Sequence, residues 1–178
     1  MVDDLFGLVR YALGGTLLLA CWWKLKDFRA FSGSLRAYGV SGALATAGAL
    51  ALICLEALAA AAAFSTVADA TVGRGIAALG LLFTMAQTYL LATGQRVSCM
   101  CFGAGAAEYV SISTWAKAAI VLTMGLLLGF AGSGARSLEP PAVAGGLLIV
   151  ATLAVLDRHR RARGFRPEVM QQFGTREV

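Results

Sequence analysis

The sequence predicts an all-α polytopic membrane protein, a four-helix bundle with a fifth transmembrane helix and a short interfacial helix. Its 178 residues are 58% hydrophobic, with a mean hydropathy of +0.74. Charged residues make up 14% of the chain, whereas soluble domains average about 25%. The apolar residues gather in runs close to the ~20 residues that cross a bilayer core. Within lipid a helix satisfies its own backbone hydrogen bonds, and the sequence has no alternating pattern typical of barrel strands.

Five apolar segments are expected to span the membrane within one domain, residues 1–157. A cleaved signal peptide is not expected, because the start "MVDD" is acidic and "CWWKLKDF" offers no small-residue cleavage site. The last two segments are short, and the fifth has the weakest signal. The expected spans are residues 5–23, 41–64, 75–94, 114–131 and 142–156.

The polar segments between and after these spans have separate predictions. In "KDFRAFSGSLRAYGV" the apolar residues Phe28, Phe31, Leu35 and Tyr38 recur at steps of three and four, which predicts an amphipathic helix along the interface. "SLEPPA" is a turn, because two prolines cannot continue a helix. Residues 158–178 are expected to form a basic C-terminal tail.

The distribution of Lys and Arg predicts the orientation. With five spans, the segment 24–40, the loop 95–113 and the tail share one side of the membrane. Twelve of the fifteen basic residues fall on that side, and three fall on or near the other. The positive-inside rule therefore predicts a cytoplasmic loop 95–113. The twelve are Lys24, Lys26, Arg29, Arg36, Arg96, Lys117, Arg158, Arg160, Arg161, Arg163, Arg166 and Arg176, and the three are Arg10, Arg74 and Arg136.

The loop "QRVSCMCFG" holds the strongest chemical signal, the pair Cys99 and Cys101. Residues two apart can bring their Cα atoms within the roughly 4.4–6.8 Å that a disulfide requires. So short a ring is expected to be strained, which favours an exchange-active pair over a structural one. The alternative is two unpaired loop cysteines. Cys21, near the end of the first span on the same side, is a candidate third redox thiol or an interfacial packing residue, whereas Cys54 is expected to pack as a small hydrophobe.

The other chemical interpretations are weaker. Cys99, Met100 and Cys101 form a soft ligand set that suits Cu(I), whereas zinc would need four ligands and the single histidine lies in the tail. The net charge of +5 gathers in inter-helix runs and the tail, which favours lipid headgroups of the bilayer over nucleic acid as a partner. No phosphate-cradling Gly-rich loop and no Ser/His/Asp arrangement supports a nucleotide-dependent enzyme or a hydrolase.

Two charges fall within the expected spans. Counted from the cysteine-loop side, Arg10 and Glu56 lie at similar depth on the first and second helices. Such residues are costly in a bilayer and usually face a partner or a cavity. We therefore predict an Arg10–Glu56 ion pair that joins the two helices, with proton transfer through Glu56 as the alternative.

Four short motifs occur in order along residues 5–130. They are "WKLKDFRAF" after the first span, "CLEALAAAA" in the second, "CMCFG" after the third and "ISTWAK" entering the fourth. Together they resemble the MauE family of methylamine-utilisation membrane proteins, which is related to the DoxX-like four-helix proteins. Cys99 and Cys101 match the family's cysteine pair, whereas Cys21 and Cys54 match no family position.

The resemblance implies a bacterial inner-membrane protein that forms or isomerises disulfides during maturation of methylamine dehydrogenase. The partners it implies are a thioredoxin-like protein and a disulfide-containing client protein. Such clients mature outside the cytoplasm, so the resemblance favours an extracytoplasmic loop while the charge count favours a cytoplasmic one. The side of the loop therefore stays open.

The order of helices and cysteines is also similar to that of vitamin K epoxide reductase and related quinone-linked thiol oxidases. That similarity makes a quinone the cofactor to test. The pair in those enzymes is C-x-x-C and here it is C-x-C, so coupling to a quinone does not follow. A non-catalytic assembly subunit and a Cu(I) carrier are the alternative functions.

Overall fold

The computed structural model describes residues 2–40, 42–94 and 110–131, together with positions 146, 148, 150 and 152. In this part of the chain the regular structure is helical, and it contains no strand. Two short elements, α2 (Phe28–Ser34) and the 3-10 helix η1 (Leu35–Tyr38), follow the first long helix. The long helices are α1 (Val2–Lys26), α3 (Gly42–Ala63), α4 (Asp69–Ala92) and α5 (Ile112–Ala131).

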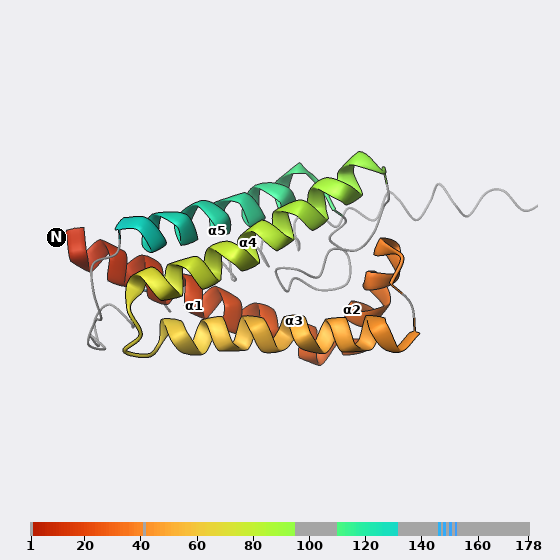
Figure 1. Ribbon diagram of the computed structural model, residues 1–178, viewed down its shortest axis with the longest axis horizontal. Coiled ribbons are helices and arrows are strands. Elements are labelled where there is room, and N and C mark those ends of the chain that lie inside the picture. The colour runs from red at the N-terminus through yellow and green to blue at the C-terminus, as the bar shows by residue number, and fades with distance from the viewer. Residues whose placement is uncertain are drawn as a thin grey trace, which may run out of the picture.

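The long helices form two antiparallel pairs, α1 with α3 and α4 with α5 (Figure 1). Between the pairs lies an apolar core that includes Leu17 of α1, Ala60 of α3, Ile76 of α4 and Val121 of α5. The C-terminal end of α4, the N-terminal ends of α3 and α5, and α2 lie toward one end of the bundle, and α1 runs toward that end but stops short of the start of α3. We call this the α2 end.

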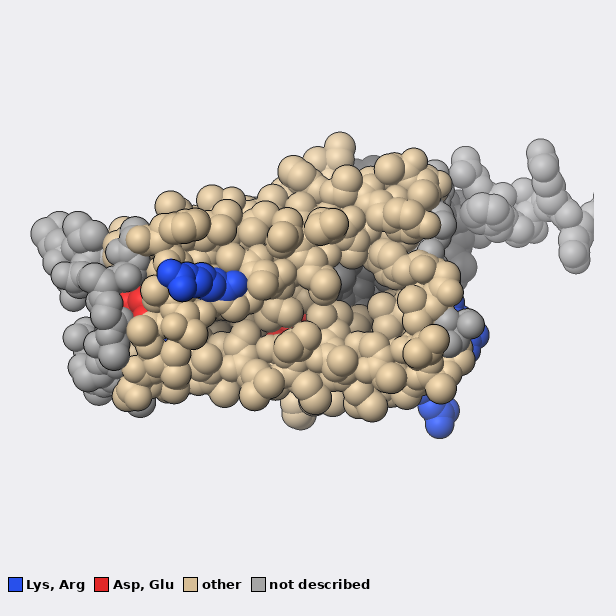
Figure 2. Space-filling view, viewed as in Figure 1, with Lys and Arg blue, Asp and Glu red and all other residues tan. Residues whose placement is uncertain are grey.

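The four long helices have the length and apolar composition of membrane spans. The candidate spans are Leu5–Lys26, Gly42–Ala63, Asp69–Ala92 and Ile112–Phe130. Large apolar side chains such as Leu44, Leu58 and Phe130 are exposed on the bundle, as expected for a surface that faces lipid. The face seen in Figure 2 consists almost wholly of residues other than Lys, Arg, Asp and Glu. The predicted all-α polytopic membrane fold is confirmed.

Glycines let α4 and α5 approach each other closely. A Cβ built on Gly80 would lie 2.7 Å from the backbone of Leu122, and one on Gly125 would lie 2.6 Å from the backbone of Ala77. A Cβ on Gly73 would lie 2.2 Å from the backbone nitrogen of Gly129. The small residues of "GLLLG" in α5 therefore hold the two backbones in direct contact, the arrangement by which membrane helices associate.

The short helix α2 packs across the N-terminal part of α3. Its buried Phe31 contacts a cluster with Ala49 and Ile53, and Phe28 and Leu35 pack against the same cluster. Three of the four apolar residues predicted to share a helix face therefore do so. Gly39, at a φ of 78°, ends η1 in the left-handed region and turns the chain toward α3.

Some predicted boundaries differ, and some predictions lie outside the described residues. Helix α4 begins at Asp69 instead of residue 75, because Asp69 is buried by an ion pair instead of lying in a solvated loop. Of the expected fifth span only four positions are described; they are helical, and Gly146 lies against Tyr11 and Ala12 of α1. The rest of that span and the tail 158–178 lie outside the described residues.

Candidate functional site

Cys99, Met100 and Cys101, the residues with the strongest chemical signal, lie outside the described residues. The helices that flank their segment are described. Helix α4 ends at Ala92 and α5 begins at Ile112, both at the α2 end of the bundle, toward which α1 also runs (Figure 1). The flanking helix ends therefore agree with the prediction that the loop 95–113 connects to the bundle on the same side as the segment 24–40.

Cys21 lies inside the bundle, level with the middle of α3. It is on α1, five residues before the helix ends at Lys26, and its side chain is 6% exposed. Its thiol donates toward two acceptors on α3, the Ile53 carbonyl oxygen at 3.6 Å and Glu56 Oε2 at 3.7 Å. Cys21 is a free thiol, and so is Cys54, which is exposed on α3.

Glu56 is held by a second residue of α1, Lys24. The Lys24 ammonium donates to Glu56 Oε1, and both side chains are 0% exposed. Cys21 and Lys24 are three residues apart, so they lie on the same face of α1 and reach the same carboxylate from it. One carboxylate thus receives a thiol on one oxygen and an ammonium on the other.

Two aromatic rings lie close to the ammonium, and a buried amide follows one of them on α4. Lys24 Nζ lies 5.4 Å from the centre of the Phe31 ring on α2 and 5.1 Å from that of Phe83 on α4. Such cation–π contacts favour a charge that has been removed from water. Gln87, one turn after Phe83 on α4, is 0% exposed, and its carboxamide has no hydrogen-bond partner among the described residues. A buried amide in this state costs about 1–3 kcal/mol unless something pairs with it.

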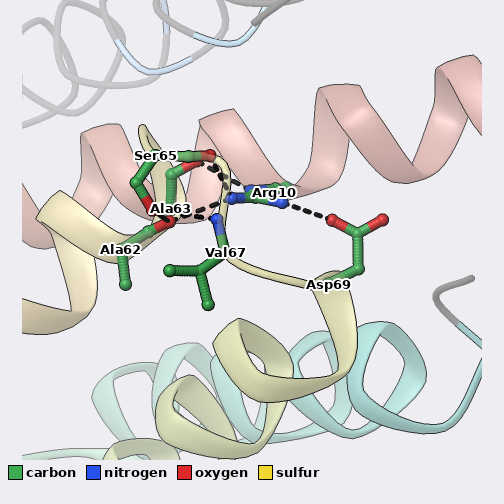
Figure 3. Close-up of polar contacts among 6 residues, drawn as sticks. All are labelled: Arg10, Ala62, Ala63, Ser65, Val67 and Asp69. Atoms are coloured by element: carbon green, nitrogen blue, oxygen red, sulfur yellow. Dashed lines mark hydrogen bonds and ion pairs between the residues drawn. The ribbon is translucent and has the colours of Figure 1, made fainter. Parts of the chain in front are cut away.

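Arg10 forms a separate polar cluster at the opposite end of the bundle (Figure 3). Its Nη1 donates to Asp69 Oδ1 at 2.6 Å, and both side chains are 0% exposed. Its remaining contacts are to backbone carbonyl oxygens where α3 ends: Nε to Ala63 at 2.8 Å, and Nη2 to Ala62 at 2.9 Å and Ser65 at 2.6 Å. Arg10 therefore caps the end of α3, where the Ala63 and Ser65 carbonyls have no helical partner among the described residues and the Ala62 carbonyl also accepts from Ser65.

The predicted Arg10–Glu56 pair is wrong in its partners. Both residues are buried and both form an ion pair, but Arg10 pairs with Asp69 and Glu56 pairs with Lys24. Arg10 contacts Ala63, and Glu56 lies seven residues before it on α3, about 10 Å along the axis. Equal depth was expected from counting residues from the helix ends. The count fails because α2 packs on α3, so α3 begins beyond the end of α1.

The buried positions of three polar side chains were not predicted from the sequence. Lys24 was expected to be an interfacial charge and Asp69 to lie in a loop, and Gln87 lies within an apolar run. The three-residue spacing of Cys21 and Lys24 was the available signal for a shared helix face. For Gln87 the signal was an amide inside a span, a position that usually carries an interhelical bond.

Metal binding gains no new support from the described helices. In the ranges 2–40, 42–94 and 110–131 no group of three His, Cys, Asp or Glu side chains could hold an ion. The Cu(I) alternative rests on Cys99, Met100 and Cys101, which lie outside those ranges.

The comparisons with known proteins identify a family. Residues 2–135 match the family described as methylamine utilisation protein MauE, and this match includes all four described long helices. Comparison with curated proteins and with solved structures found no match. The match covers well over half of the chain and agrees with the four apolar helices, so the resemblance noted from the motifs is confirmed. The chain belongs to the MauE family of methylamine-utilisation proteins and is a multi-pass membrane protein.

Proposed function

We propose that this protein is a membrane thiol–disulfide redox protein in which Cys99 and Cys101 form or isomerise disulfides in a partner protein. The client that fits its family is an enzyme of methylamine utilisation with several disulfides. The observation that carries the proposal is the placement of Cys21. A free thiol is held inside the bundle beside the Glu56–Lys24 ion pair, and the helix ends that flank the cysteine segment lie together at the α2 end.

The proposed chemistry is thiol–disulfide exchange through a mixed disulfide. In oxidation, a client thiolate attacks one sulfur of the Cys99–Cys101 disulfide and forms a mixed disulfide. A second client thiolate then attacks the client sulfur of that mixed disulfide, and the loop cysteine leaves as a thiolate. The client gains one disulfide, and the loop pair gains two electrons and two protons. In isomerisation, the reduced pair attacks a client disulfide and is released again, so the client exchanges one pairing for another without net electron transfer.

Oxidation requires an acceptor that takes the two electrons from the reduced pair. A thioredoxin-like disulfide protein or a quinone would serve, and both follow from the resemblances described above. Isomerisation requires neither. The two modes therefore differ in whether the reduced pair accumulates when the acceptor is withheld.

The test is to trap the mixed disulfide with single substitutions. In Cys99→Ser and Cys101→Ser, the substitution of the resolving cysteine is expected to leave the attacking one bonded to its partner. The adduct should migrate as a larger species that a reducing agent dissolves. Cys54→Ser is the matched control, because Cys54 is a free thiol exposed on α3 and has no role in the proposed exchange.

The outcomes separate the three candidate functions. If neither substitution traps an adduct and the client's disulfides form normally in the double variant, the redox function is refuted. Stoichiometric copper that is lost in the double variant would instead identify a Cu(I) carrier. A client that loses assembly only when the tail is removed would identify a scaffold. A membrane-impermeant maleimide applied to intact cells reports the side on which the cysteine segment lies.

A further inference from the structure

The interior of the bundle contains a thiol and an ammonium that contact the two oxygens of one carboxylate. Cys21 Sγ lies 3.7 Å from Glu56 Oε2, and Lys24 is bonded to Glu56 Oε1. Lys24 and Glu56 are 0% exposed and Cys21 is 6% exposed. An ion pair alone would be sufficient to join α1 to α3, so the thiol on the second carboxylate oxygen calls for a separate explanation.

A buried thiol normally reacts slowly, because its reactive form is the thiolate and an isolated thiolate is costly to form in an apolar interior. Loss of the Cys21 proton to water would leave the group of three with a net negative charge. Transfer of the same proton to Glu56 leaves the net charge unchanged. The product would be a thiolate and a neutral carboxyl group, with the Lys24 ammonium still beside them as counter-ion.

The described surroundings are compatible with this transfer. The titratable groups around Cys21 are Lys24 on α1 and Glu56 and the exposed thiol Cys54 on α3, and of these Lys24 and Glu56 are charged. Helix α2 contributes the Phe31 ring and α4 contributes the Phe83 ring, and both rings lie close to the Lys24 ammonium. The rings hold the ammonium whether its counter-ion is the carboxylate or the thiolate.

We propose that Glu56 is the proton acceptor of Cys21, and that Lys24 stabilises the resulting thiolate, which makes Cys21 a reactive thiol inside the membrane bundle. In exchange with a disulfide, a bond forms between the Cys21 sulfur and one sulfur of that disulfide. The other sulfur leaves and takes the proton from Glu56. One disulfide is broken and one is formed, so no oxidant or reductant is needed. The proposal rests on the proposed redox function for its biological role, but its test does not need Cys99 or Cys101.

The test measures alkylation of a variant that retains Cys21 as its one cysteine, in detergent, with N-ethylmaleimide. The thiolate adds to the double bond of the reagent, and the new carbon centre takes the proton. General acid–base assistance typically contributes about 10²–10⁴-fold, so Glu56→Gln is expected to slow alkylation by on the order of a hundredfold. Glu56→Asp keeps a carboxylate on a shorter side chain. Its alkylation rate should lie between the rates of the unsubstituted protein and of Glu56→Gln.

If Glu56 acts on Cys21 only through its charge, Glu56→Gln should speed alkylation instead of slowing it. The direction of the change therefore distinguishes the two explanations. If Glu56 only repels a thiolate, its replacement by an uncharged amide makes the thiolate easier to form, and alkylation becomes faster. An unchanged or increased rate in Glu56→Gln would therefore overturn the proposal. A variant that retains only Cys54 is the control, because in the described part of the chain that exposed thiol forms no hydrogen bond with Glu56 and should be alkylated equally fast with and without it.

A second measurement needs no substitution at Glu56, in case the Gln variant fails to assemble. Proton transfer within the group makes the thiolate fraction independent of pH, so the alkylation rate of Cys21 should be flat between about pH 6 and pH 9. Proton loss to water instead gives a rate that rises about tenfold with each pH unit, which would overturn the proposal. The rate must also rise in proportion to the N-ethylmaleimide concentration. A rate limited by opening of the bundle would be independent of that concentration.

Discussion

Substitution of Gly73 by alanine tests whether the close approach of α4 and α5 stabilises the bundle. The added Cβ would lie 2.2 Å from the backbone nitrogen of Gly129 and 2.6 Å from its Cα. Nonbonded carbon atoms ordinarily approach to about 3.5–4.0 Å, so the two helices must separate by ~1 Å or more. Overpacking of this kind costs about 1–3 kcal/mol, and the better helix propensity of alanine returns up to about 1 kcal/mol. We expect a net loss of roughly 1–2 kcal/mol.

The chain offers a matched control two residues away. Gly75 lies on the same helix, and a Cβ there would meet nothing within 4 Å. Gly75→Ala should therefore be neutral or stabilising. Reversible unfolding in detergent, followed by circular dichroism, should show the unfolding equilibrium shifted by about five- to thirtyfold in Gly73→Ala relative to the unaltered protein. If Gly73→Ala and Gly75→Ala unfold at the same denaturant concentration, direct backbone contact does not hold α4 to α5.

Two further predictions use the same unfolding assay. Asp69→Asn leaves the buried Arg10 charge without its counter-ion and should cost about 3–5 kcal/mol, whereas an unchanged stability would mean that the backbone carbonyls alone neutralise the guanidinium. Trp115→Phe removes the hydrogen bond from the indole nitrogen to Thr88 Oγ1 at 3.0 Å, which joins α5 to α4, and should cost about 0.5–1.5 kcal/mol. Thr88→Val removes the same bond, so a Trp115→Phe/Thr88→Val double variant that loses the full sum of the two single effects would show that the bond contributes nothing.

Hydropathy was sufficient to find the four long helices, because each must bury an apolar surface against lipid and against its neighbours. It placed the start of α4 six residues late. Asp69 and Arg74 have the composition of a solvated loop, and only the tertiary contact with Arg10 makes Asp69 part of a helix. The apolar face of α2 was also predictable, since Phe28, Phe31 and Leu35 follow helical spacing and pack as that spacing requires.

The ion-pair partners of the buried charges were not predictable from the sequence. The sequence indicates that Arg10 and Glu56 each need an opposite charge, but not how far α1 and α3 are offset along their axes. That offset is set by the packing of Phe31 against Ala49 and Ile53, a contact between segments whose relative position no local pattern encodes. The same offset brings Cys21 level with Glu56, which is why the thiol's contact with a carboxylate appears only in three dimensions.

The contacts of Arg10 have a consequence for how the chain is made. Every acceptor of its guanidinium belongs to residues 62–69, and 59 residues separate Arg10 from Asp69. When α1 first leaves the ribosome, none of these acceptors has been synthesised, and an unpaired arginine inside a lone transmembrane helix is costly to insert. We therefore expect α1 to stay at the translocon until the turn between α3 and α4 emerges, so that the N-terminal half of the protein enters the bilayer as one unit.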